Sequence, residues 1–218
     1  MDIELILKVW VFFAKAALVT VEVSALACAL GLALGLIGAL GKLSDYRALR
    51  YPATVYVSAF RGTPCLVQLF IIYFGGPQIG LNLEPFAAGV LGLGLNIGAY
   101  MSESIRGAIV AVDRGQWDAA RSLGLRYLPT VRLVILPQAA ALMIRPLGVN
   151  TVALIKGSAL VSAISVVELT YTAHRFISST YKPFEMFALS AFFYLIIITV
   201  VTRAIRALDE RYAVQGHG

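Results

Sequence analysis

Residues 98–137 decide how this chain is organised, and they read GAYMSESIRGAIVAVDRGQWDAARSLGLRYLPTVRLVILP. The second half of this stretch is basic and polar, and long apolar runs lie on both sides of it. Its arginines are Arg106, Arg114, Arg121, Arg126 and Arg132. A positively charged segment between apolar runs is typical of a cytoplasmic loop in a membrane protein, so residues 113–137 are predicted to form such a loop.

The composition supports a membrane protein independently. The 218 residues are 59% hydrophobic and only 14% charged, and the mean hydropathy is +0.82, far from the averages of soluble domains. Several apolar runs reach the roughly 20 residues that cross a bilayer core of about 30 Å. The net charge of +6 lies in short loops, where it orients a chain in a membrane, so nucleic-acid binding is not expected.

Five membrane-spanning helices in one domain, residues 1–218, are the simplest partition. The predicted spans are residues 14–40, 54–74, 86–112, 150–171 and 185–206. One straight helix over residues 137–170 would be about 51 Å long, which exceeds the bilayer core. Pro146 and Gly148 offer a break, so residues 138–147 are predicted to form a separate short helix near the cytoplasmic surface.

Basic residues give the chain a direction. The first loop carries Lys42, Arg47 and Arg50, with Arg61 close behind, and the third loop carries the arginines named above. Residues 75–85 contain no Lys or Arg. The positive-inside rule therefore predicts an N-terminus outside and a C-terminus in the cytoplasm.

The third loop resembles the EAA loop of bacterial ABC importer permeases. That pattern, E-A-A-x3-G-x9-I-x-L-P, matches Asp118-Ala119-Ala120, Gly124, Val134 and Leu136-Pro137. Asp118 stands for the Glu and Val134 for the Ile. In such permeases this loop contacts the ATPase, so the resemblance implies a transport pore driven by another subunit.

Further motifs resemble the polar amino acid branch of these permeases, over roughly residues 10–212. They are Arg61-Gly62-Thr63-Pro64 with Gln68, the run from Asn96 through Tyr100, Glu103 and Arg106 to Ile109, Gly115-Gln116, Leu136-Pro137-Gln138-Ala139, and Tyr181-Lys182-Pro183-Phe184-Glu185. The resemblance implies an all-α, type I importer permease of the MetI-like fold with a cytoplasmic coupling helix. It would move polar amino acids across the bacterial inner membrane by alternating access.

The same resemblance implies the partners. They are an ABC ATPase dimer, a second copy of this chain or a related permease, a periplasmic amino-acid-binding protein, and membrane lipid. Gly41-Lys42 is followed by Leu43 rather than Ser or Thr, so it is no phosphate-binding loop. ATP and Mg²⁺ are therefore expected on the partner ATPase, with no cofactor, metal or catalytic residue on this chain.

A short helix around residues 116–123 is predicted to dock in a groove of the ATPase. Small alanines allow close approach, Trp117 offers a large interface anchor, an early acid suits the positive helix end, and Gly124 can end the helix. The predicted coupling residues are Gly115, Gln116, Trp117, Asp118, Ala119, Ala120, Arg121, Leu123 and Gly124.

Polar residues inside the spans are candidates for the substrate pathway, because charges in a membrane usually face a cavity or a partner. The candidates are Gln68, Asn96, Glu103, Lys156, Ser158 and Glu168. Glu103 and Lys156 would receive a zwitterionic substrate, pair with each other, or only stabilise the fold. Gly157 stands where the branch often has Asp, which favours cystine-like or glutamine-like substrates over arginine or lysine.

Two other classes of function compete with this prediction. An ATP-independent secondary transporter or channel would show internal inverted repeats, and none is evident. A membrane-embedded enzyme would need convergent catalytic or metal-binding groups, whereas Cys28 and Cys65 are isolated and the Glu and Lys residues are scattered.

Overall fold

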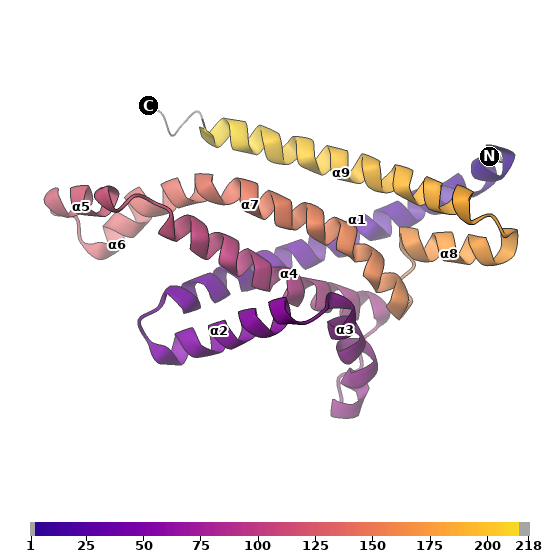
Figure 1. The fold of residues 1–218 in the computed structure, drawn as a ribbon, viewed down its shortest axis with the longest axis horizontal. Helices are drawn as coiled ribbons and strands as arrows, with labels where there is room; N and C mark the ends of the chain where they lie inside the picture. Colours follow the sequence, from indigo (N-terminus) through magenta and orange to yellow (C-terminus); the bar gives the residue numbers. More distant parts are fainter. Residues whose placement is uncertain (1–2, 214–218) are drawn as a thin grey trace.

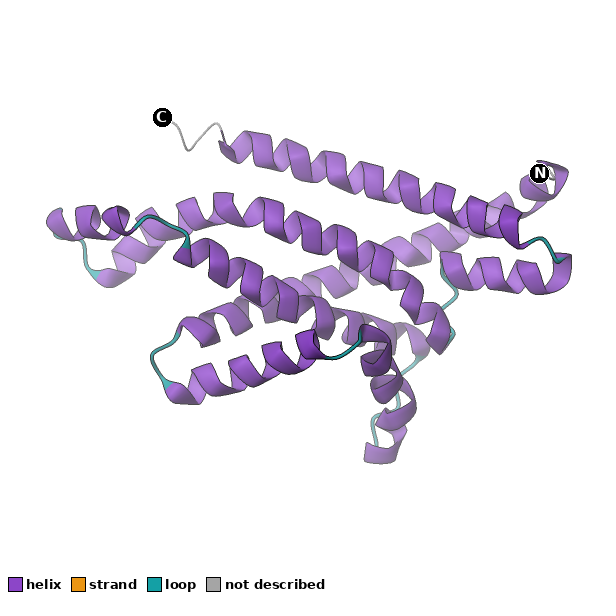
Figure 2. Cartoon of the chain, viewed as in Figure 1, coloured by secondary structure: helices purple, strands orange, loops and turns teal. Residues whose placement is uncertain are grey.

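The computed structural model describes residues 3–213, and every regular element within them is helical (Figure 2). The long elements are α1 (Ile3–Leu43), α2 (Arg47–Gly62), α4 (Pro85–Val110), α7 (Leu136–Gly157) and α9 (Pro183–Ala213). The short ones are α3 (Cys65–Phe70), η1 (Ile71–Gly75), η2 (Gly76–Ile79), α5 (Arg114–Ser122), α6 (Tyr127–Thr130), η3 (Val131–Ile135), η4 (Ser158–Ile164) and α8 (Leu169–Thr180).

The long helices α1, α4, α7 and α9 run lengthwise through the molecule (Figure 1). Helix α4 packs on both α1 and α7, and α9 packs on α7, α8 and α1. The short helices α5 and α6 project at one end, and α8 caps the other end (Figure 1). A bundle of this kind separates a loop at one end from a turn at the other by the length of a membrane span.

Helices α1 and α4 form the most extensive contact in the chain, and glycines make it close. A Cβ at Gly35 would lie 2.8 Å from the Met101 Cβ, and one at Gly98 would lie 3.0 Å from the Leu34 Cβ. Small residues at such an interface let two helix backbones approach closely, which is how helices associate in a membrane.

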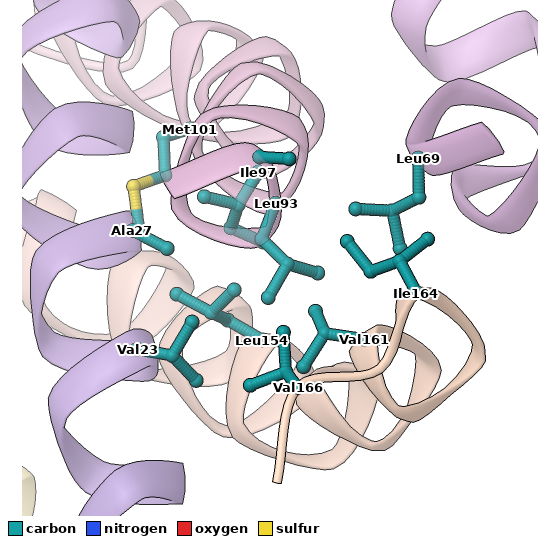
Figure 3. Packing of buried hydrophobic residues seen from close by; sticks show 11 residues of the cluster. Val23, Ala27, Leu69, Leu93, Ile97, Met101, Leu154, Val161, Ile164 and Val166 are labelled. Atoms are coloured by element: carbon teal, nitrogen blue, oxygen red, sulfur yellow. The ribbon is translucent and has the colours of Figure 1, made fainter. Parts of the chain in front are cut away.

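The main core lies where α1, α4 and α7 meet the start of α3 and the turn after α7. Its buried members include Val23, Leu93, Met101, Leu154 and Val161 (Figure 3). A second buried cluster joins the first half of α1 to α8 and α9, around Phe13, Leu169 and Met186.

Within residues 3–213, three helical segments are long and apolar enough to cross a membrane, namely Glu4–Leu43, Tyr127–Ile164 and Pro183–Tyr212. The pair Arg47–Gly62 and Cys65–Ile79 counts as a fourth if its two bent halves are taken together. Helix α4 has the length of a span, but its glycines and polar residues lower its hydropathy, in keeping with its position between α1 and α7. The all-helical fold is as predicted, whereas the number of crossings and their direction stay predictions.

The predicted break near Pro146 is wrong. Helix α7 runs through Pro146 without interruption, and the chain turns only after η4, at Ser165, whose φ is 68°. The span therefore lies earlier than residues 150–171. Neighbouring helices make an internal proline tolerable in a membrane helix, and Gly148 serves packing, since a Cβ there would lie 2.6 Å from the Ile205 Cγ2.

The predicted second span, residues 54–74, is not one straight helix either. Helix α2 ends at Gly62, and the chain turns by 108° before Cys65–Ile79 continues. Thr63 has extended backbone angles, and Pro64 follows it with φ −64° and ψ 135°. A proline disfavours helical angles for the residue before it, which explains why the helix stops there.

Candidate functional site

The predicted coupling helix exists as α5, and side chains and glycine fix both of its ends. The Asp113 carboxylate accepts a hydrogen bond from the Gly115 N–H at 2.6 Å, which caps the first turn. At the other end Gly124 adopts a φ of 76°. The Leu125 N–H then donates to the Ala120 carbonyl at 3.0 Å, so the helix ends at a glycine in the left-handed region, as predicted.

The inner face of α5 rests on the segment that leads into α7. Ala120 is buried, and the Trp117 ring stacks on Tyr127 with 5.8 Å between ring centroids. Trp117 also packs against the buried residues Val112 and Ile135. The half-buried Trp117 ring therefore holds α5 onto its own support, and its part in an external interface stays a prediction.

A polar link joins two separate motifs of the loop. The Gln138 side-chain amide donates to the Gln116 Oε1 at 3.1 Å and to the Val134 carbonyl at 3.0 Å. Gln116 belongs to α5 and Gln138 to the first turn of α7. A displacement of α5 would therefore be transmitted to α7.

The outer face of α5 is exposed. Asp118, Ala119 and Ser122 are exposed, and Leu123 exposes 81% of its surface. Asp118 lies in the middle of α5 rather than in its first turn, and the acid at the positive end is Asp113. Small, acidic and apolar groups thus face outward on a projecting helix.

Space lies between the coupling loop and the end of α1. A cavity of about 410 Å³ is lined by Leu40 and Leu43 of α1, by Ile109 of α4, and by Trp117 and Val131 of the loop. Because α5 is supported mainly by the segment leading into α7, it has room to move relative to α1.

Gln68 and Asn96 meet at the bend between α2 and α3. The Gln68 amide donates to the Phe60 carbonyl at 2.9 Å and to the Thr63 Oγ1 at 2.8 Å, while its Oε1 accepts from the Asn96 amide at 3.0 Å. Asn96 donates to the Phe60 carbonyl as well, at 3.2 Å. Both side chains therefore satisfy backbone groups that the bend leaves without helical partners.

Glu103 carries two cationic partners. It bonds to Lys42 at the end of α1 and to Arg106 on its own helix, where the Arg106 Nη2 lies 2.8 Å from the Glu103 Oε2. The alternative of a Glu103–Lys156 pair is wrong, because Lys42 and Arg106 occupy both carboxylate oxygens.

Glu168 and Ser158 are also satisfied within the chain. The buried Glu168 carboxylate caps α8 by accepting from the Tyr171 N–H at 2.7 Å, and it accepts from the Tyr194 hydroxyl at 2.8 Å. The buried Ser158 hydroxyl donates to the Ile155 carbonyl at 2.8 Å. Each polar atom thus has a structural partner.

Lys156 differs from these residues. It is exposed and makes no hydrogen bond or ion pair with another residue of the described range 3–213. It lines a groove of about 650 Å³ between α7 and α9, together with Arg206 and with Arg145, which bonds to Asp209 at 2.8 Å.

Residues 31–214 match the family described as the inner membrane component of binding-protein-dependent transport systems. The chain belongs to this family. It is a transport permease, of a family whose ATPase is a separate subunit.

Relatives agree with this assignment. The permease is 37% identical to the putative glutamine transport system permease protein GlnP of Rickettsia conorii, over 93% of this chain and 94% of that protein. It is 45% identical to the L-cystine transport system permease protein TcyB of Bacillus subtilis, over 69% of this chain and 64% of that protein.

Solved structures resemble the permease over nearly its whole length. An amino acid ABC transporter crystallised with histidines matches with a TM-score of 0.91 and 36% identity, over 97% of this chain and 99% of that one. The MetNI methionine ABC transporter in an inward-facing form matches with a TM-score of 0.77 and 19% identity, over 92% and 96%, which shows the same fold.

Sequence reasoning missed several residues that organise the site. Asp113 has the usual signal of a helix cap, an Asp directly before a short helix, and could have been found. Lys42 and Tyr127 have no such signal. The partner of Lys42, Glu103, lies 61 residues away in the sequence, and the partner of Tyr127, Trp117, lies across a loop. Arg61 follows the basic first loop closely in the sequence, but its guanidinium lies over the Tyr100 ring, beside the middle of α4.

Proposed function

We propose that this permease imports neutral polar amino acids across a bacterial inner membrane, taking them from a periplasmic binding protein. The driving force is ATP hydrolysis on a separate ATPase dimer. Two permease chains, either identical or related, enclose the path.

The observation that carries the proposal is the coupling helix. Helix α5 is capped at both ends, stands clear of the bundle and presents exposed small and acidic groups with Leu123 beside them. Such a helix offers a compact projection to a groove on a soluble subunit.

Motion at α5 has a direct route into the membrane. The helix is joined to α4 by Ala111, Val112 and Asp113, and it is linked to α7 through the Gln116–Gln138 hydrogen bond. Closure of the ATPase dimer on ATP would draw the coupling helices of two permeases together. Helices α4 and α7 would then turn the path from inward-facing to outward-facing, and hydrolysis would reset it.

Gly157 and the relatives favour a neutral substrate. The carboxylate of an Asp at this position could face a cationic side chain of the substrate. Gly157 has no carboxylate. The similar permeases are named for glutamine and for cystine, and both substrates are polar without a net positive charge. We infer the same substrate class for this permease.

The test is reconstitution in proteoliposomes with the cognate ATPase and binding protein. ATP-dependent uptake of glutamine or cystine, competed weakly by arginine, is the expected result. Uptake that persists when the ATPase subunit is omitted would instead indicate a secondary transporter or channel. Preferred uptake of arginine would overturn the substrate class.

A further inference from the structure

Arg61 is a cation at the depth of the membrane that the chain leaves unpaired. It is the fourteenth residue after Arg47, the start of α2, so it lies about 21 Å along that helix. Its guanidinium lies 5.3 Å from the centre of the Tyr100 ring. Tyr100 lies about 22 Å from the start of α4 at Pro85 and about 15 Å from its end at Val110, which places Arg61 beside the middle of a span.

No acidic residue within the described range 3–213 forms an ion pair with Arg61. Its side chain is exposed, and the Tyr100 ring covers only one face of the guanidinium. A cation–π contact leaves the N–H donors at the guanidinium edge free. Because a charged side chain in a membrane normally faces a cavity or a partner, Arg61 needs an anionic ligand or water.

A stripe of polar residues runs along α2 toward Arg61, beside exposed apolar residues such as Val55. Tyr51, Thr54, Ser58 and Arg61 are all exposed, and their spacing of three and four residues places them on one face of α2. Lipid tails offer such a face no hydrogen bonds. The stripe is therefore better suited to face water or protein than lipid, and Arg61 lies at the end of it that is farther from the start of α2.

The backbone beside Arg61 leads to the same conclusion independently. Thr63 and Pro64 are non-helical and exposed in this chain. Non-helical backbone at membrane depth is tolerated only where protein covers it or where it lines an aqueous cavity. The Gln68–Asn96 cluster holds this bend in place, so it positions Arg61 rather than offering its own amides to a ligand.

We propose that Arg61 receives the α-carboxylate of the transported amino acid midway across the membrane. A guanidinium matches a carboxylate with two parallel hydrogen bonds, and it stays protonated in proteins. The group recognised is common to all amino acids, so Arg61 serves passage rather than selection among side chains. This inference rests on the proposed import of amino acids.

The test uses the complete transporter in proteoliposomes, with a permease whose Cys28 and Cys65 are replaced by alanine. In this background, Arg61→Cys should lower uptake by about tenfold or more, as expected when a charge-assisted hydrogen-bond pair is lost. Treatment with an aminoethyl thiosulfonate restores a cation at residue 61 and should recover much of the uptake. A sulfonatoethyl reagent adds an anion and should not. Arg47→Cys, at the cytoplasmic end of the same helix, is the matched control and should respond alike to both reagents.

Other outcomes of this experiment would overturn the proposed role of Arg61 or the proposed function. Unchanged uptake by Arg61→Cys, or equal recovery with both reagents, would overturn the role of the charge. Loss of subunit assembly in both Arg61→Lys and Arg61→Cys would show that Arg61 instead holds a partner chain. If the parent complex hydrolyses ATP but imports no amino acid, the proposed function fails, whatever Arg61 does.

Discussion

Two groups of polar residues lie within the helices of this permease, and they differ in how their hydrogen-bonding capacity is used. Glu103, Glu168 and Gln68 have partners for their side chains inside the same chain. Arg61 and Lys156 are exposed and have no acidic partner within residues 3–213. The satisfied residues hold helices in place, whereas the unpaired cations are available to a ligand.

Of the alternatives that the sequence left open for Glu103 and Lys156, this difference favours a structural role for the carboxylate. The acid of that pair, Glu103, ties the end of α1 to α4 through Lys42. The cations remain, which suits a path that must attract the carboxylate of an amino acid.

The largest loss of stability is expected when Glu168, the most buried acid, is removed. Glu168→Ala deletes the cap of α8 and leaves the Tyr194 hydroxyl without its acceptor, so we expect a loss of about 2–3 kcal/mol of stability. Thermal unfolding in detergent measures this. Glu168→Gln, which keeps an acceptor oxygen, should lose less, and equal stability of the alanine variant and the wild type would contradict a structural role.

Glu103→Gln tests the second satisfied acid. It leaves Lys42 and Arg106 without their common counter-ion in a partly buried position, and we expect a loss of about 1–3 kcal/mol. The double variant Lys42→Met with Glu103→Gln should cost less than the sum of the single changes, because the same interaction is removed once. Additive effects on the unfolding midpoint would show that the two residues do not interact.

Lys156→Gln tests one of the two unpaired cations. The side chain is exposed and unpaired, so stability should stay within about 0.5 kcal/mol of the wild type. Uptake should fall several-fold while ATP hydrolysis continues. Normal uptake by this variant would remove Lys156 from the pathway, and a large loss of stability would place it with the structural residues.

The smallest effect is expected at Gly157. A Cβ there would meet no atom within 4 Å, so Gly157→Asp should fold normally. The new carboxylate should raise the ratio of arginine to glutamine uptake by a factor that corresponds to about 1 kcal/mol or less. Uptake with a binding protein that delivers both amino acids measures the ratio. An unchanged ratio would show that residue 157 does not contact the transported amino acid.

Sequence reasoning predicted the helical fold and the coupling loop because both depend on local patterns. Apolar runs have the length of a bilayer, and Gly124 ends α5 because the following turn requires a positive φ. The partners of Trp117 and Glu103 were not predicted, since they depend on which faces of distant segments meet. The continuity of α7 through Pro146 was mispredicted because packing against neighbours outweighed the usual effect of proline.

The most direct measurement concerns coupling between α5 and the ATPase. Leu123→Glu changes a side chain that is 81% exposed on the coupling helix, and Ile79→Glu changes one that is 83% exposed and lies on η2, far along the chain. Uptake and ATP hydrolysis are measured together in proteoliposomes. We predict that Leu123→Glu lowers the number of amino acids imported per ATP, while Ile79→Glu leaves that ratio unchanged. An unchanged ratio in Leu123→Glu, with full uptake, would contradict coupling through this helix.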